Sequence, residues 1–132
     1  ITNILGDWNA AHLSDVEIKQ YYESSKLVIL PINNTLVSSG QSAGLQAAAV
    51  GTAVVTTKTI GFWDYESYKD GENILFVENN ELKNWTSIVK EAYENDSLLL
   101  NIGKNSKKLV NNTYHLDIFN TKLESFLAFE NV

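Results

Sequence analysis

Three residue types are absent from this sequence, namely cysteine, methionine and arginine, and proline occurs once. Without cysteine the chain has no disulfide framework, no cysteine zinc site and no thiol nucleophile, which is compatible with a reducing compartment. Without arginine all 10 basic residues are lysines, and 16 acidic residues bring the net charge to −6. Affinity for nucleic acid comes mainly from basic side chains that release counterions, so we expect neither DNA nor RNA as a partner.

Long apolar runs are absent as well. No stretch is long enough to cross a bilayer, and the first residues lack the basic start and apolar run of a signal peptide. We therefore expect no transmembrane segment and a cytoplasmic location. Peripheral attachment to the inner face of the membrane, as part of a longer protein, is the alternative.

The chain has 132 residues, of which 44% are hydrophobic, and this is enough for one domain with a buried core. It begins at Ile1, in what reads as the tail of a strand over residues 1–5. We therefore interpret residues 1–132 as a single domain that lacks its N-terminal part.

The rest of the sequence alternates strand signals with helix signals. Apolar runs at 27–30, 53–55 and 74–77 are continuous rather than alternating. Such runs are typical of strands that are buried on both faces of a parallel sheet. The alternation predicts an α/β fold, a Rossmann-like parallel sheet flanked by helices.

Five helices are predicted around these strands. Ser14 and Glu17 have the spacing of a capping box, so the first helix should begin at residue 15. A helix of small residues should stop at Gly51, which can adopt the left-handed cap conformation. Gly103 is a position at which the fourth helix could bend or divide. The predicted helices cover residues 15–24, 41–50, 81–95, 98–113 and 116–130.

The loop at residues 31–39 gives the strongest indication of function. In an open parallel sheet, ligands bind outside the carboxyl ends of the strands. This loop follows the first full strand, is small and polar, and leads directly into the small-residue helix. The first N–H groups of a helix lack backbone partners and carry the positive end of the helix dipole. The sequence therefore predicts a site for phosphate at Ser38, Ser39, Gly40, Gln41 and Ser42.

The same loop also has a purely structural interpretation. Its sequence matches neither the P-loop nor the dinucleotide-binding fingerprint. Ser38 or Ser39 could cap the helix while Gly40 permits a tight turn. From spacing alone, this interpretation is favoured.

From Tyr21 to about Phe126 the sequence resembles the C-terminal, donor-binding domain of GT-B-fold glycosyltransferases, in the retaining superfamily of glycogen-synthase-like and mannosyltransferase-like enzymes (glycosyl transferases group 1). Residues 45–55, LQAAAVGTAVV, resemble the family's helix and following strand. Gly61, the Asp64-Tyr65 pair, the turn at 70–73 and the run at 74–77 then follow in the family's order.

This resemblance implies a hexosyltransferase-like enzyme of polysaccharide biosynthesis. The donor would be a nucleotide sugar such as a UDP- or GDP-sugar, with no metal or other cofactor. The acceptor would be a glycan or lipid bound through an N-terminal domain outside this chain. The cations that stabilise the leaving diphosphate would lie before Ile1, so we expect no catalytic residue in this chain and no activity from it alone.

Two glutamates of the family fall on Ser38 and Gln46 in this sequence. Gln46 retains an acceptor that the ribose hydroxyls of the donor could use. Ser38 is shorter and uncharged at the position that contacts the transferred sugar. The resemblance thus places donor binding at residues 38–42 with Gln46, although without either carboxylate.

Lys58 and His12 are weaker candidates for donor binding. Lys58 is the only lysine at the carboxyl end of a predicted strand, where it could neutralise a phosphate, although a solvated loop lysine is favoured. His12 lies in a strand-end loop and could touch the base or ribose, although a surface or packing role is favoured.

The loop at 58–68 carries further ambiguous side chains. Phe62 and Trp63 could stack on a sugar or base, but the favoured interpretation is that they fix the loop onto the core. Asp64 and Asp70 lie in acidic stretches that superficially resemble a metal-binding motif. Their turn setting favours solvated carboxylates instead.

Three functions therefore remain open from the sequence. The first is the donor-binding part of a GT-B glycosyltransferase. The second is a nucleotide-sugar epimerase or catalytically silent binding module of the same fold, motivated by the missing carboxylates. The third is a flavodoxin-like interaction domain in which the serine-glycine loop is only a helix cap.

Overall fold

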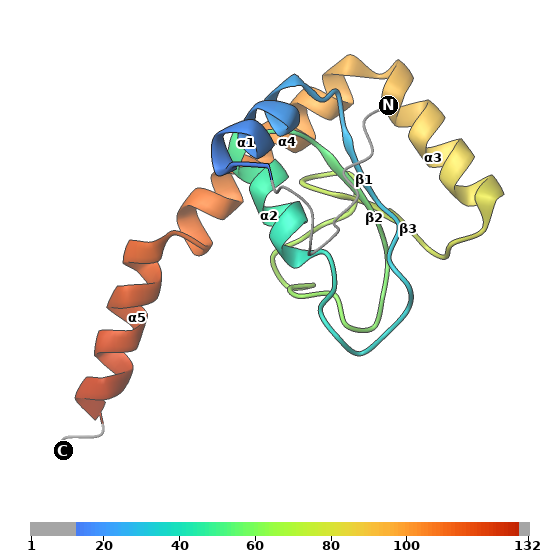
Figure 1. Cartoon of the computed structure of the whole chain (residues 1–132). Helices are drawn as coiled ribbons and strands as arrows, with labels where there is room; N and C mark the ends of the chain where they lie inside the picture. Colours follow the sequence, from blue (N-terminus) through green and yellow to red (C-terminus); the bar gives the residue numbers. More distant parts are fainter. Residues whose placement is uncertain (1–12, 130–132) are drawn as a thin grey trace.

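A computed structural model describes residues 13–129 of the chain (Figure 1). The strand tail predicted at residues 1–5 and the candidate His12 lie outside the described residues. The model contains the predicted α/β architecture, in which three parallel strands form a sheet with helices on both faces.

The sheet has the strand order β1 (Val28–Leu30), β2 (Val54–Thr57) and β3 (Leu75–Val77), with both pairs parallel. Every residue of β2 is buried, as its continuous apolar run predicts. The same prediction is wrong for β1, since Ile29 is 45% exposed. The reason is position: β1 pairs only with β2 in the described sheet, and the helix on that face packs against β3.

Two clusters of buried side chains hold the helices to the sheet. Val54 and Phe76 belong to the cluster that contains Ala47 of α2 (Gln41–Val50), and Tyr22 of α1 (Asp15–Ser24) packs against it. Alternate strand residues face the other way, so Leu75 packs against the second cluster. That cluster contains Ala92 of α3 (Leu82–Glu94) and both Leu99 and Ile102 of α4 (Asp96–Thr113).

The helix ends follow the local sequence signals. The Ser14 and Glu17 side chains form the predicted capping box at the start of α1. Gly51 ends α2 in the left-handed conformation with φ 91°. Both predictions are confirmed.

Gly103 has a different role from the one its sequence position suggests. It lies inside α4, which runs unbroken from Asp96 to Thr113. A Cβ at Gly103 would overlap the carbonyl group of Gly51, so this glycine lets α4 cross the end of α2 with the two backbones in contact. The prediction of a bend or division was wrong because it considered only the sequence of the helix and not its contact with Gly51.

The last helix, α5 (Leu116–Phe129), points away from the sheet and the other helices (Figure 1). Its apolar stripe is exposed, with Phe119 at 59% and Phe126 at 64%. Within residues 13–129 no helix combines the length and apolar character needed to span a membrane.

Candidate functional site

The loops that follow the three strands meet at one edge of the sheet, because parallel strands end on the same side (Figure 1). The loop at 31–39 leaves β1, the loop at 58–68 leaves β2, and residues 78–81 leave β3. The N-terminus of α2 opens at the same edge, directly after the first of these loops. The structure thus assembles the predicted region from segments far apart in the sequence.

The start of α2 has no cap from its own side chains. Gly40 is the N-cap residue, in the left-handed conformation with φ 73°, and no side chain bonds to the first turn. Among the described residues nothing accepts from the backbone N–H groups of Gln41, Ser42 or Ala43, whereas Gly44 N donates to Gly40 O at 2.9 Å. The interpretation of Ser38 or Ser39 as a helix cap is therefore wrong, and no residue of 13–129 would compete with an anion for these three N–H groups.

Backbone contacts fix the loop that leads into this turn. Gly61 N donates to Thr35 O at 2.9 Å, and Ile60 N donates to the Asn34 Oδ1 atom at 3.0 Å. A Cβ at Gly61 would lie 2.6 Å from Thr35 O, so the two loops touch where only glycine fits. The loop at 31–39 is thus held in place by the loop that follows β2.

Gln46, the other predicted donor-binding residue, lies on the exposed side of α2. Its Oε1 atom accepts from the hydroxyl group of Tyr22 at 3.5 Å, the outer limit of a hydrogen bond. The side-chain amide N–H groups of Gln46 are not bonded to any described residue. The structure places Gln46 on the same helix as Gly40, Gln41 and Ser42.

Lys58 lies at the carboxyl end of β2, as predicted, but its ammonium group is already paired. Its Nζ atom is 2.9 Å from Glu78 Oε1 across the ends of β2 and β3. Hydrogen bonding and attraction to Glu78 raise the pKa of Lys58, which therefore keeps its charge. A phosphate could bind the Lys58 ammonium group only by displacing the Glu78 carboxylate.

Phe62 and Trp63 fix their loop onto the core, as the favoured interpretation holds. Phe62 is 9% exposed, with its ring 5.0 Å from the ring of Phe76. Trp63 lies against Gly44 of α2, where an added Cβ would come within 2.8 Å of the indole. Phe62 is thus buried, and Trp63 is half-buried between its loop and α2.

Asp64 and Asp70 bond to the protein itself rather than being merely solvated. Asp64 accepts from the hydroxyl of Tyr114 at the end of α4 and from Ser67 N. Burial acts to raise the pKa of Asp64, but these hydrogen bonds outweigh it and lower the pKa below the usual value. Asp70 Oδ1 accepts from Phe76 N at 2.8 Å. Residues 13–129 contain no group of three or more potential metal-ligating His, Cys, Asp or Glu side chains.

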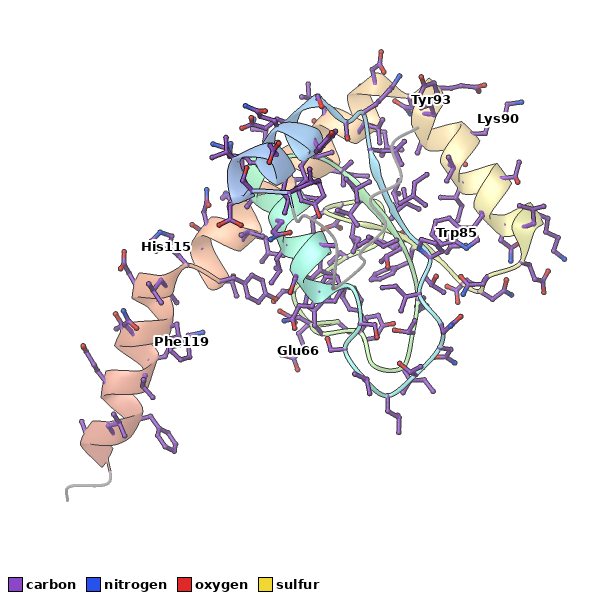
Figure 2. The ribbon with its side chains drawn as sticks, viewed as in Figure 1. Glu66, Trp85, Lys90, Tyr93, His115 and Phe119 are labelled. Carbon is purple, nitrogen blue, oxygen red and sulfur yellow. The ribbon has the colours of Figure 1, made fainter. Side chains whose placement is uncertain are left out.

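Sequence analysis missed three polar residues at this edge. Thr57 is the last residue of β2 and Asn80 follows β3, and their side chains bond to each other. Trp85 of α3, which is labelled in Figure 2, bonds to Asn80. Thr57 and Asn80 could have been noted as polar residues at strand ends. The participation of Trp85 had no local signal, since it depends on how α3 packs.

A solved structure shares this fold: the C-terminal domain of a glycosyl transferase group 1 family protein, LpcC, from Francisella tularensis. The TM-score is 0.65, with 23% sequence identity. The match covers 81% of this chain and 52% of the other, so this chain spans about half the length of that domain structure. The predicted fold is confirmed, namely that of the C-terminal domain of a group 1, GT-B-type glycosyltransferase.

No family model matches the sequence, and no curated protein matches it either. The likeness is therefore one of fold.

Proposed function

We propose that this chain binds a nucleoside-diphosphate sugar at the carboxyl edge of its sheet, as the donor-binding part of a glycosyltransferase. One observation carries the proposal. The left-handed Gly40 opens α2 beyond the end of β1, and no described residue accepts from the first N–H groups of this helix, in a chain with the fold of a group 1 glycosyltransferase C-terminal domain.

The chemistry fits the leaving group of such a transfer. A nucleoside diphosphate departs with developing negative charge, which fixed N–H donors can stabilise without rearranging. The N–H groups of Gln41, Ser42 and Ala43 point along the axis of α2, where the helix dipole adds partial positive charge. A chain without arginine can hold a diphosphate in this way.

Side chains around the turn supply the remaining contacts. Ser38, Ser39 and Ser42 are exposed and carry hydroxyl groups that can donate to phosphate or sugar. The side-chain N–H groups of Gln46, which bond to no residue in the described part of the chain, can donate to ribose oxygens. Lys58 would join the site only by leaving Glu78.

The rest of the reaction would come from outside this chain. We place the acceptor, a glycan or lipid, and the catalytic cations on an N-terminal domain of a longer, cytoplasmic protein. No metal or other cofactor is needed, because backbone amides and these cations take the charge of the diphosphate. The chain alone would bind donor without turnover.

Titration calorimetry with UDP, GDP and ADP tests donor binding. We expect heat of binding with at least one of them, and Gly40→Ala should weaken it about tenfold or more, because alanine at positive φ strains the turn. The added methyl group would also press on the Ile32 side chain.

Gly71→Ala is the matched control. Gly71 has nearly the same φ, 75°, but an added Cβ meets nothing within 4 Å, and it lies in a turn before β3. Gly71→Ala should introduce the same backbone strain without the contact to Ile32, and it should leave the affinity unchanged. Absence of binding by the wild-type chain with all three nucleotides would overturn the proposed function.

A second candidate is an epimerase or a catalytically silent binding module of the same fold. The residues Ser38 and Gln46, at positions where the family carries carboxylates, favour it. Incubation of the longer protein with radiolabelled nucleotide sugar and a glycan or lipid acceptor separates the two. Label in a larger product supports transfer, whereas isomerised or unchanged sugar supports the second candidate.

A further inference from the structure

Thr57 and Asn80 form a closed set of hydrogen bonds around the backbone of Ile32. Ile32 N donates to Thr57 Oγ1 at 3.0 Å, and the Thr57 hydroxyl donates to Asn80 Oδ1 at 2.7 Å. Asn80 Nδ2 donates in turn to Ile32 O at 3.0 Å. Both backbone groups of Ile32 are therefore held by side chains from the ends of β2 and β3.

Trp85 fixes the direction of these bonds. Its indole Nε1 donates to Asn80 Oδ1 at 3.1 Å, and an indole N–H can only donate. The Asn80 atom that faces it must be oxygen, so the Thr57 hydroxyl must give its proton to that oxygen. The Thr57 oxygen keeps its lone pairs, and one of them accepts from Ile32 N. Figure 2 shows Trp85 on the side of α3 that faces the strand ends.

Ile32 connects this set of bonds to the proposed diphosphate site. Its Cδ1 atom lies so close to Gly40 that a Cβ at Gly40 would overlap it. Gly40 is the residue whose left-handed conformation opens α2 and whose carbonyl group accepts the first bond of the helix, from Gly44. A shift of the Ile32 side chain would therefore change its contact with Gly40, the residue that sets the direction of the first N–H groups of α2.

We propose that Thr57 and Asn80 are positioning residues that hold Ile32 against Gly40 and so preset the α2 N-terminus for a diphosphate. Neither side chain needs to touch the ligand. The inference rests on the proposed function and extends it to residues that belong to other strands and loops.

Thr56 and Thr57 offer a matched test, because they are neighbours on β2 and both are buried, at 0% and 2% exposed. The Thr56 hydroxyl donates to Leu30 O at 3.1 Å and has no bond to Ile32. Valine at either position keeps the shape of the side chain. Thr56→Val removes one buried hydrogen bond and Thr57→Val removes two, so both variants should lose stability and Thr57→Val should lose more. Only Thr57→Val leaves Ile32 N without its acceptor.

The experiment measures two quantities in the wild-type chain and in Thr57→Val, Thr57→Ser and Thr56→Val. The first is the affinity for UDP, GDP and ADP by calorimetry. The second is the hydrogen-exchange rate of the Gly44 amide, corrected for global unfolding with amides of β2. We expect Thr57→Val to weaken binding about fivefold and to speed Gly44 exchange about as much, the effect of one hydrogen bond. Thr57→Ser should restore both, and Thr56→Val should change neither.

Asn80→Asp is a second variant, which tests the inference if Thr57→Val does not fold. It is isosteric at an exposed position and replaces the donor to Ile32 O by an oxygen. It should likewise weaken binding and speed Gly44 exchange.

The outcomes separate this inference from the function on which it rests. If the wild-type chain binds a nucleotide and every variant binds it with the same affinity, the inference is overturned and the proposed function stands. Unchanged Gly44 exchange in Thr57→Val and Asn80→Asp would also overturn it. If the wild-type chain binds no nucleotide, the function fails and the positioning role fails with it, whatever the exchange rates.

Discussion

The two ends of the sheet are held together in different ways. At the amino end of β2, Gly51 and Gly103 bring the backbones of α2 and α4 into contact, beside the buried Ala53. At the carboxyl end, the side chains of Asn34 and Asn80 tie loops to one another through hydrogen bonds. The contact between α2 and α4 depends on packing, whereas polar side chains join the loops at the carboxyl end, in addition to the close approach of Gly61 to Thr35.

The two kinds of contact differ in how readily their groups can exchange partners. A backbone-to-backbone contact has no room for an added atom and cannot adjust, since protein interiors are close-packed. Polar side chains can exchange one partner for another at small cost. The carboxyl end also carries the first N–H groups of α2, for which the described structure offers no acceptor, and it is there that we place the nucleotide sugar.

The largest effect should come from Gly103→Ala, which attacks the packed end. The methyl group would overlap the Gly51 carbonyl, so α4 must move away from α2. We expect the free energy of unfolding to fall by about 3 kcal/mol or more, measured by urea denaturation. Lys104→Ala, at the next and exposed position of α4, is the control and should change it by about 0.5 kcal/mol or less. Equal stabilities would mean that the two backbones are not in contact.

Tyr114→Phe tests a polar contact on the carboxyl side, the bond from the Tyr114 hydroxyl to Asp64. Loss of a partly buried bond to a carboxylate should lower the free energy of unfolding by about 2 kcal/mol near neutral pH. Tyr21→Phe is the control, because its hydroxyl bonds to no described residue; it should change stability by about 0.5 kcal/mol or less.

The pH dependence of the Tyr114→Phe effect follows from the lowered pKa of Asp64. Because the pKa of Asp64 is lower in the folded chain than in the unfolded chain, the ionised carboxylate stabilises the fold at pH values above the unfolded pKa. This stabilisation is lost as the pH falls through the pKa of the folded chain. The gap between wild type and Tyr114→Phe should therefore narrow from about pH 6 to about pH 3. A gap that widens on acidification would contradict the role of the ionised carboxylate.

The smallest effect should come from the exposed pair of Lys58 and Glu78. Lys58→Gln should leave the unfolding midpoint unchanged, since an exposed ion pair is screened by solvent. If Lys58 assists the donor, this variant should weaken nucleotide binding about threefold, and Glu78→Gln should strengthen it by removing a competitor. Unchanged affinity in both variants would remove Lys58 from the site.

The sequence predicted the elements well where the signal was local. The capping box at Ser14 and the left-handed Gly51 depend on residues within one helical turn, and both are present. The predicted fold is the one found in the group 1 glycosyltransferase domain. The loop at 31–39 was placed correctly at a strand end, because the strand order along the chain was clear.

Errors arose where a residue's role depends on a distant segment. Gly103 was interpreted as a weak point of a helix, but its role is set by Gly51, far away in the sequence. Ser38 and Ser39 have the right spacing for a cap, yet the left-handed Gly40 takes the cap position. The Asp64 carboxylate was expected to be solvated, but it accepts a hydrogen bond from the Tyr114 hydroxyl at the end of α4.

The amino-acid sequence by itself determined the order of strands and helices, the net negative charge and the small polar loop before α2. These follow from composition, periodicity and caps, which act between near neighbours. Only the tertiary structure decided that, within residues 13–129, no side chain caps the first N–H groups of α2, and that Thr57 and Asn80 bond to Ile32 from across the sheet. The reason is that a hydrogen bond forms between whichever donor and acceptor the packing brings within 3 Å or so, and sequence separation sets no limit on that pairing.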